Sequence, residues 1–146
     1  MSATFEQLAE DKVGTIYIDR FDKGLRIVVL RGPASLCAYI GVPVAHPLAG
    51  EQYDNLPIEC HGGLTFAGEG ATEKNCLPPG HFYYGWDYSH CDDAAFYDLQ
   101  YRDEMRGKRW TVAEVEGELW MPAYQMKRLM KMAENIFAKG AGWRKP

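Results

Sequence analysis

The stretch Phe82-Tyr83-Tyr84-Gly85-Trp86-Asp87-Tyr88 decides the fold. Alternate side chains of an extended chain point to opposite faces, so the aromatic residues at even positions share one face. Large aromatic side chains gathered on one face are typical of a hydrophobic core. The sequence therefore predicts a β-strand over residues 82–88, with Asp87 projecting away from that core beside Gly85.

The segments around this strand predict a mainly antiparallel sheet. The turn-forming residues Asp22-Lys23-Gly24 separate two apolar segments, which indicates a β-hairpin. The further strands that we expect are 14–21, 25–31, 36–42, 57–60 and 63–67. Residues 68–80 combine glycine, proline and small polar side chains, and they predict an irregular loop.

Helices are expected at both ends of the chain. Residues 3–13 have a helix-compatible composition and predict a short leading helix. Thr111 and Glu114 have the spacing of a capping box, which begins a helical region over 111–139 that Gly140 ends. Its apolar side chains recur at steps of three and four, as in an amphipathic helix. They are Val115, Leu119, Ala123, Met126, Leu129, Met130, Ala133, Ile136 and Phe137.

Pro122 lies inside this helical region. A proline removes a backbone donor and clashes with the preceding turn, so we expect a kink or a division into two helices near Trp120-Met121. Helices at both ends of a mainly antiparallel sheet make an α+β fold. A length of 146 residues fits a single domain over 1–146.

Composition narrows the class of protein. The net charge of −4 argues against non-specific nucleic-acid binding, which needs a basic surface. The longest aliphatic run, residues 27–30, is too short to cross a bilayer, and no signal-peptide pattern begins the chain. The cysteines at 37, 60, 76 and 91 contain no Cys-x-x-Cys pair. We therefore expect reduced thiols in a cytoplasmic protein without membrane contact.

Two short segments concentrate the residues that are suited to chemistry. Residues 60–66 contain His61, and residues 85–93 contain Asp87, His90 and Asp93. Imidazole and carboxylate groups together suit zinc, manganese or iron, and the spacing 87, 90, 93 fits a short turn. These four residues are the metal-ligand set that the sequence predicts, with Asp92, Cys60 and Cys91 as neighbouring alternatives.

The same residues allow two interpretations without a metal. In one, His61 is a general base oriented by Asp87, and His90 is the complementary acid. The amides of Gly62 and Gly63 then cradle an anion, with Thr65 as a further ligand-binding residue. In the other, Asp87 and His90 merely cap a turn, and His61 bonds a backbone carbonyl. No serine or cysteine carries the sequence context of a nucleophile.

With its segments His61-Gly62-Gly63-Leu64-Thr65-Phe66 and Gly85-Trp86-Asp87, the chain resembles a family of small proteins encoded by bacteriophages and prophages. The resemblance rests on His61-Gly62-Gly63-Leu64-Thr65-Phe66, followed by Gly85-Trp86-Asp87 and the residues at 90–93, and it covers most of 25–137. It implies a phage origin and action in the host bacterial cytoplasm. It also implies that His61, Gly62, Gly63, Asp87, His90 and Asp93 are hallmark positions. Tyr88 stands where similar proteins often carry a small residue.

Three functional hypotheses follow. Phage accessory proteins of this size often act against host defences, which favours a binding protein that inhibits a host factor or captures a small ligand. The absence of a recognisable nucleophile also favours that interpretation. The alternative is a small hydrolase or transferase that uses a divalent metal such as zinc at the His/Asp residues. The third is a structural or regulatory phage protein.

Overall fold

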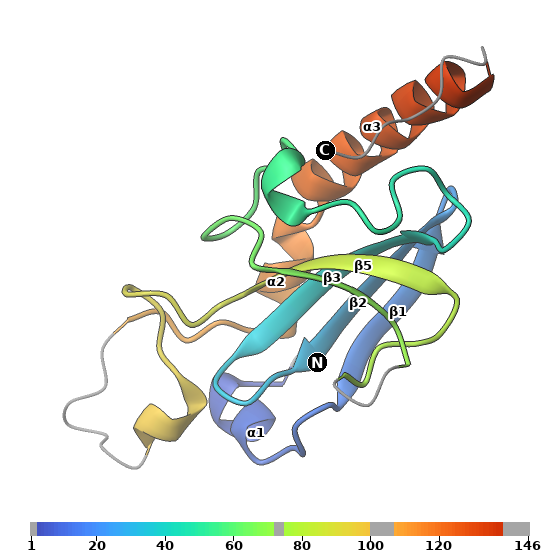
Figure 1. Ribbon diagram of the computed structural model, residues 1–146. Helices are drawn as coiled ribbons and strands as arrows, with labels where there is room; N and C mark the ends of the chain where they lie inside the picture. Colours follow the sequence, from blue (N-terminus) through green and yellow to red (C-terminus); the bar gives the residue numbers. More distant parts are fainter. Residues whose placement is uncertain (1–2, 72–74, 100–106, 139–146) are drawn as a thin grey trace.

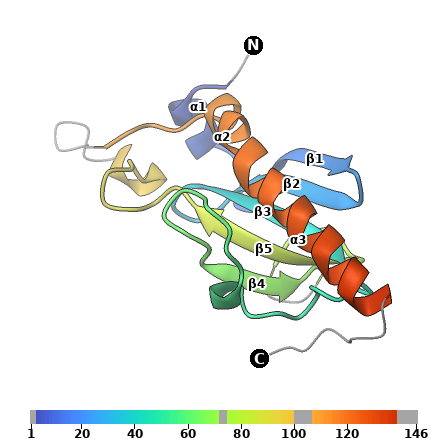
Figure 2. The same ribbon diagram turned by 90° about the horizontal axis from the view of Figure 1, so that it is seen from above.

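The strand predicted at 82–88 lies inside a five-stranded antiparallel sheet with the order β1-β2-β3-β5-β4 (Figures 1 and 2). The computed structural model describes residues 3–71, 75–99 and 107–138. The aromatic strand is β5, and it pairs with β3 on one side and β4 on the other. The strands are β1 (Ile16–Asp22), β2 (Leu25–Arg31), β3 (Leu36–Pro43), β4 (Phe66–Glu69) and β5 (His81–Asp87).

The predicted hairpin is confirmed as β1 and β2, which a two-residue turn joins. Lys23 and Gly24 have φ angles of 50° and 86°. Positive φ at both central residues is the mark of a type I′ turn, whose twist matches that of the flanking strands. Glycine adopts such a φ without strain, whereas lysine rarely does.

The helices are α1 (Phe5–Ala9), α2 (Val112–Glu118) and α3 (Trp120–Ala138), with a 3-10 turn, η1 (Tyr53–Asn55), after β3. The capping box at Thr111 is confirmed, because its hydroxyl accepts from the Glu114 amide and the Glu114 side chain accepts from the Thr111 amide. The division near Pro122 is confirmed too, with the joint at Leu119. Pro122 lies in the first turn of α3. Backbone N–H groups in the first turn have no acceptor within the helix, so a proline there costs no helical hydrogen bond. The predicted end at 139–140 lies outside the described residues.

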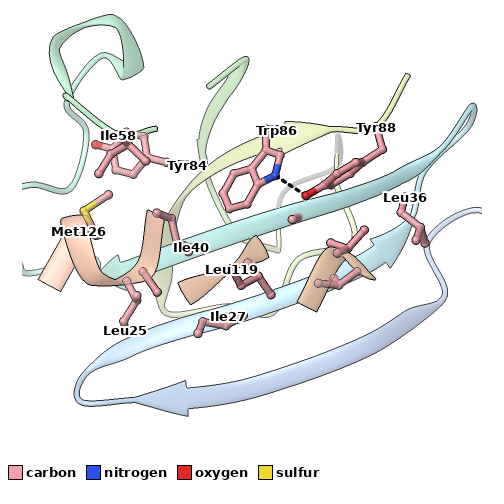
Figure 3. Close-up of a cluster of buried hydrophobic side chains, with 14 of the residues drawn as sticks. Leu25, Ile27, Leu36, Ile40, Ile58, Tyr84, Trp86, Tyr88, Leu119 and Met126 are labelled. Carbon is pink, nitrogen blue, oxygen red and sulfur yellow. Dashed lines mark hydrogen bonds between the residues drawn. The ribbon is translucent and has the colours of Figure 1, made fainter. Parts of the chain in front are cut away.

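Helices α2 and α3 lie across one face of the sheet (Figure 2). That face carries the aromatic row of β5, and Tyr84, Trp86 and Tyr88 are buried there with aliphatic side chains of β2 and β3 (Figure 3). The helical stripe contributes Val115, Leu119, Ala123, Met126, Met130 and Ala133. Ile136 and Phe137, predicted on the same stripe, are exposed because the end of α3 extends past the sheet (Figure 1).

Three predicted segments differ in the structure. The leading helix is shorter than 3–13 and covers Phe5–Ala9. Residues 57–60 form no strand, because the buried Ile58 is not aligned with a neighbouring strand. The strand expected at 63–67 is β4, which reaches Glu69 and so occupies the start of the expected loop at 68–80. In the same loop Leu77 is buried against Val28, Leu30 and Tyr83 on the opposite face of the sheet.

These elements make an α+β fold in one domain, as predicted. Among the residues that the structure describes, no helix has the length and apolar character to cross a bilayer.

Candidate site around His61 and Asp93

The carboxylate of Asp93 joins the two segments that the sequence singled out. Its Oδ2 accepts hydrogen bonds from Nε2 of His61 at 2.7 Å and from the backbone amide of His90 at 2.9 Å. Its Oδ1 accepts from Nε1 of Trp110 at 2.8 Å. The side chain is only 3% exposed, so both oxygens are satisfied by protein donors. Residues far apart in sequence therefore meet at one buried acid.

These contacts set the charge state of Asp93. Burial by itself raises the pKa of a carboxyl, but the hydrogen bonds from His61, the His90 amide and Trp110 outweigh it. The pKa of Asp93 is accordingly lowered below its usual value. The group is an anion at neutral pH, held by directed donors rather than by solvent.

The imidazole of His61 is fixed in orientation and in tautomer. Its ring stacks on Tyr88, with centroids 4.5 Å apart and planes 14° apart, and meets Trp110 edge-on at 5.0 Å. An ionised carboxylate only accepts, so Nε2 carries the hydrogen of the bond to Asp93. Within the described residues Nδ1 has no hydrogen-bond partner. The neutral ring therefore keeps a lone pair on Nδ1.

Local backbone geometry brings His61 and His90 together. Gly62 and Gly63 have φ angles of 70° and 81°, and the Gly63 amide donates to the Cys60 carbonyl at 3.0 Å. This turn lets the ring of His90 lie against the backbone of Gly62. The imidazole centroids of His61 and His90 are 5.5 Å apart.

The sequence predicted that Asp87 orients His61. This prediction is wrong, because the acid that bonds His61 is Asp93. Asp87 accepts from the amide and hydroxyl of Ser89 and lies 3.5 Å from Nε2 of His90. Alternation along β5 directs Asp87 to the face of the sheet opposite Tyr88, whereas His61 stacks on Tyr88 itself. Asp87 therefore shapes the turn before His90.

The predicted metal set of His61, Asp87, His90 and Asp93 does not converge as ligands. Among the described residues no group of three or more His, Cys, Asp or Glu side chains is arranged to hold a metal ion. The reason is local, since both oxygens of Asp93 are already engaged by His61, His90 and Trp110.

Two amides near the predicted anion cradle, and one of the predicted thiol ligands, have contacts within the protein. The Gly63 amide bonds the Cys60 carbonyl, and the Thr65 amide bonds the Gly85 carbonyl at 2.9 Å, which continues the pairing of β4 with β5. Burial raises the pKa of the Cys60 thiol to about 12. Cys37, Cys60, Cys76 and Cys91 are all free thiols. The amides of Gly63 and Thr65 are therefore engaged within the protein, and the Cys60 thiol is a weak nucleophile.

A hollow of about 360 Å³ adjoins His61. It lies where the segment 59–61 faces the joint between α2 and α3. The hydroxyl of Tyr88 accepts from Trp86 and donates to Glu118 at 2.8 Å, so the Glu118 carboxylate is held at the edge of the hollow (Figure 3 shows the Trp86–Tyr88 bond). The lining residues are Glu59, Cys60, His61, Gly117, Glu118, Trp120 and Met121.

Sequence reasoning missed Trp110, Glu118 and Trp120. They come from the segment before α2 and from the helix joint, and no spacing in the sequence connects them with His61. The one available signal was Trp120 itself. It is a large aromatic residue near Pro122, and it does not belong to the apolar stripe of the predicted helix. Comparison of the chain with protein-family models, with curated proteins and with solved structures found no match.

Proposed function

We propose that this protein acts by binding, as a phage- or prophage-encoded accessory protein in the host cytoplasm that inhibits a host factor. The hollow beside His61 receives a basic side chain of that host protein. One observation carries the proposal: two carboxylates, Glu59 and Glu118, and the indole of Trp120 surround the same hollow.

The chemistry of the rim suits a cation. Trp120 is 66% exposed, although a large aromatic side chain usually avoids water. An exposed indole attracts an ammonium or guanidinium group through its π face, and exposed tryptophans are frequent anchors of protein interfaces. Glu118 supplies a carboxylate whose position the Tyr88 hydroxyl fixes. A lysine or arginine side chain would meet both groups at once.

A short arginine-rich peptide serves as the probe, with calorimetry as the readout. We expect the wild-type protein to bind it, and Trp120→Ala and Glu118→Gln each to weaken binding by about tenfold. Tyr97→Ala is the matched control, because Tyr97 is 62% exposed and does not line the hollow. The same two variants should lose the inhibitory effect in the host while keeping the wild-type melting temperature. Undiminished peptide binding by both variants would remove the proposal.

A second candidate function rests on the pair of His61 and Asp93. Here His61 takes a proton from water at Nδ1, the resulting hydroxide attacks an acyl carbon, and the leaving group recovers the proton from His61. Asp93 orients the ring through its hydrogen bond with Nε2. This route needs no thiolate, which agrees with the raised pKa of Cys60.

His61→Gln separates the two candidates. A hydrolase would lose turnover of an activated ester such as para-nitrophenyl acetate in this variant, whereas a protein that acts by binding alone would show no ester turnover in wild type or variant. Retention of ester hydrolysis by His61→Gln would exclude catalysis by the pair.

A further inference from the structure

A second hollow, of about 470 Å³, lies on a different part of the surface, between α3 and the turn that joins β1 to β2. Two contacts hold these elements together: Lys127 Nζ bonds Asp22 Oδ2 at 2.6 Å, and Gly24 lies beside Met130. Figure 2 shows α3 passing this hairpin. The lining residues are Lys23, Tyr124, Lys127, Arg128, Met130, Lys131 and Glu134. None of them lines the hollow beside His61.

The lining is strongly cationic in a protein whose net charge is −4. Its one acid, Glu134, is engaged by Nε2 of His46 at 2.8 Å, and Lys127 is paired with Asp22. Lys23, Arg128 and Lys131 have no carboxylate within ion-pair distance in the part of the chain that the structure describes. Three unpaired cations beside one hollow repel one another, and an anion would relieve that repulsion.

Lys23 provides an independent observation. It occupies the first central position of a type I′ turn at a φ of 50°, where asparagine, aspartate or glycine is strongly preferred. A lysine in this conformation costs stability, and the Lys23 side chain is exposed. Unfavourable backbone conformations of this kind concentrate at binding sites. The position places an ammonium group at the hollow, which a turn-favouring residue would not do.

Tyr124 adds a flat apolar surface to the cations. The ring is 51% exposed, and its hydroxyl accepts a hydrogen bond from Arg128 at 3.1 Å. The guanidinium of Arg128 also lies 5.8 Å from the ring centroid. These contacts hold an exposed ring in place, as a platform on which a planar group stacks.

We infer that this hollow binds a nucleotide. The phosphates lie on Lys23, Lys131 and Arg128, and the base stacks on Tyr124. Lysine and arginine are the usual partners of phosphate, and a volume near 470 Å³ falls within the range of small-molecule sites. This binding is separate from the proposed inhibitory surface and does not depend on it.

The test is calorimetric titration with ADP, adenosine and pyrophosphate at near-physiological salt. We expect ADP to bind, adenosine to bind far more weakly, and pyrophosphate to bind about tenfold more weakly than ADP because it lacks the stacking group. Lys131→Gln and Tyr124→Leu should each weaken ADP binding by about tenfold. Lys12→Gln, which removes an exposed cation away from the hollow, is the control and should bind ADP as the wild type does.

Lys23→Asn is the sharpest variant. It should weaken ADP binding while leaving the melting temperature at or above that of the wild type, so lost binding is not explained by lost fold. Absence of ADP binding by the wild type would overturn the inference, as would pyrophosphate binding as tightly as ADP. Equal loss in Lys12→Gln and Lys131→Gln would reveal unspecific charge attraction and would overturn it as well. Trp120→Ala and Glu118→Gln should bind ADP normally, whatever becomes of the proposed function.

Discussion

The imidazole of His90 covers Gly62: a Cβ built on Gly62 would lie 2.6 Å from Cδ2 of His90 and nearer still to Nε2. A Cβ on the neighbouring Gly63 would meet nothing within 4 Å. Both glycines have positive φ, 70° and 81°. The two positions therefore share the same backbone requirement but differ in their contact with the histidine.

Alanine substitution should reveal this difference. Gly63→Ala is expected to cost about 1 kcal/mol of unfolding free energy, because an L side chain is strained at positive φ. Gly62→Ala should cost about 1 kcal/mol more, since the ring of His90 must also move. Urea unfolding measures both. In a His90→Ala background the two costs should become equal, and a gap that persisted there would rule out the ring as its cause.

Asp93→Asn should destabilise the protein by about 2 kcal/mol at neutral pH. An asparagine amide would point a donor at one of the three donors that Asp93 now accepts from His61, His90 and Trp110. Asp92→Asn is the matched control, because Asp92 is exposed and its side chain makes no hydrogen bond with the described residues. Guanidinium unfolding of the three proteins gives the comparison.

The cost of Asp93→Asn should also depend on pH. The pKa of Asp93 is lowered in the folded protein, so its carboxylate contributes stability above the unfolded value of about 3.9 and loses it as pH falls through the folded pKa. The unfolding free energies of wild type and Asp93→Asn should therefore converge as the pH falls below about 4. A difference that stayed constant over this range would show that Asp93 titrates as in the unfolded chain.

Local signals predicted the fold well. Alternation over 82–88 gave β5, and the capping box of Thr111 and Glu114 gave the start of α2, because each pattern is complete within a few neighbouring residues. The strand predicted at 57–60 was wrong. Ile58 is buried but has no partner strand, and a single sequence does not show which segments pair. A strand also needs a neighbouring strand to pair with, and where that neighbour is distant in the chain, a single sequence does not identify it.

In the site, too, contacts between residues near in sequence were predicted and contacts between distant residues were not. Spacing brought His90 and Asp93 into one turn correctly, as the bond from the His90 amide to Asp93 shows. It did not reveal which acid faces His61, because that depends on the side of the sheet on which His61 stacks. Trp110 and Glu118 were missed for the same reason, since both approach from the helical end of the chain.

The cysteines should differ in reactivity. Burial raises the pKa of Cys60 to about 12 and that of Cys37 to about 11. At pH 8 a thiol with a pKa near 12 is ionised in roughly one molecule in ten thousand, and only the thiolate reacts. Iodoacetamide should therefore modify the exposed Cys76 and Cys91 well before Cys37 and Cys60, as peptide mass spectrometry can follow. Early modification of Cys60 would contradict this prediction and make Cys60 a candidate nucleophile.

Lys23→Asn should stabilise the folded protein by about 0.5–1 kcal/mol, because asparagine tolerates the left-handed conformation that lysine adopts at a φ of 50°. Thermal unfolding without added nucleotide measures the gain, which should raise the melting temperature by about 2–4 °C. Lys12→Asn is the control, since it makes the same substitution at a residue where φ is not positive. If Lys23→Asn were neutral or destabilising, lysine would not be costly in this turn. The argument that Lys23 is retained for binding would then lose its physical basis.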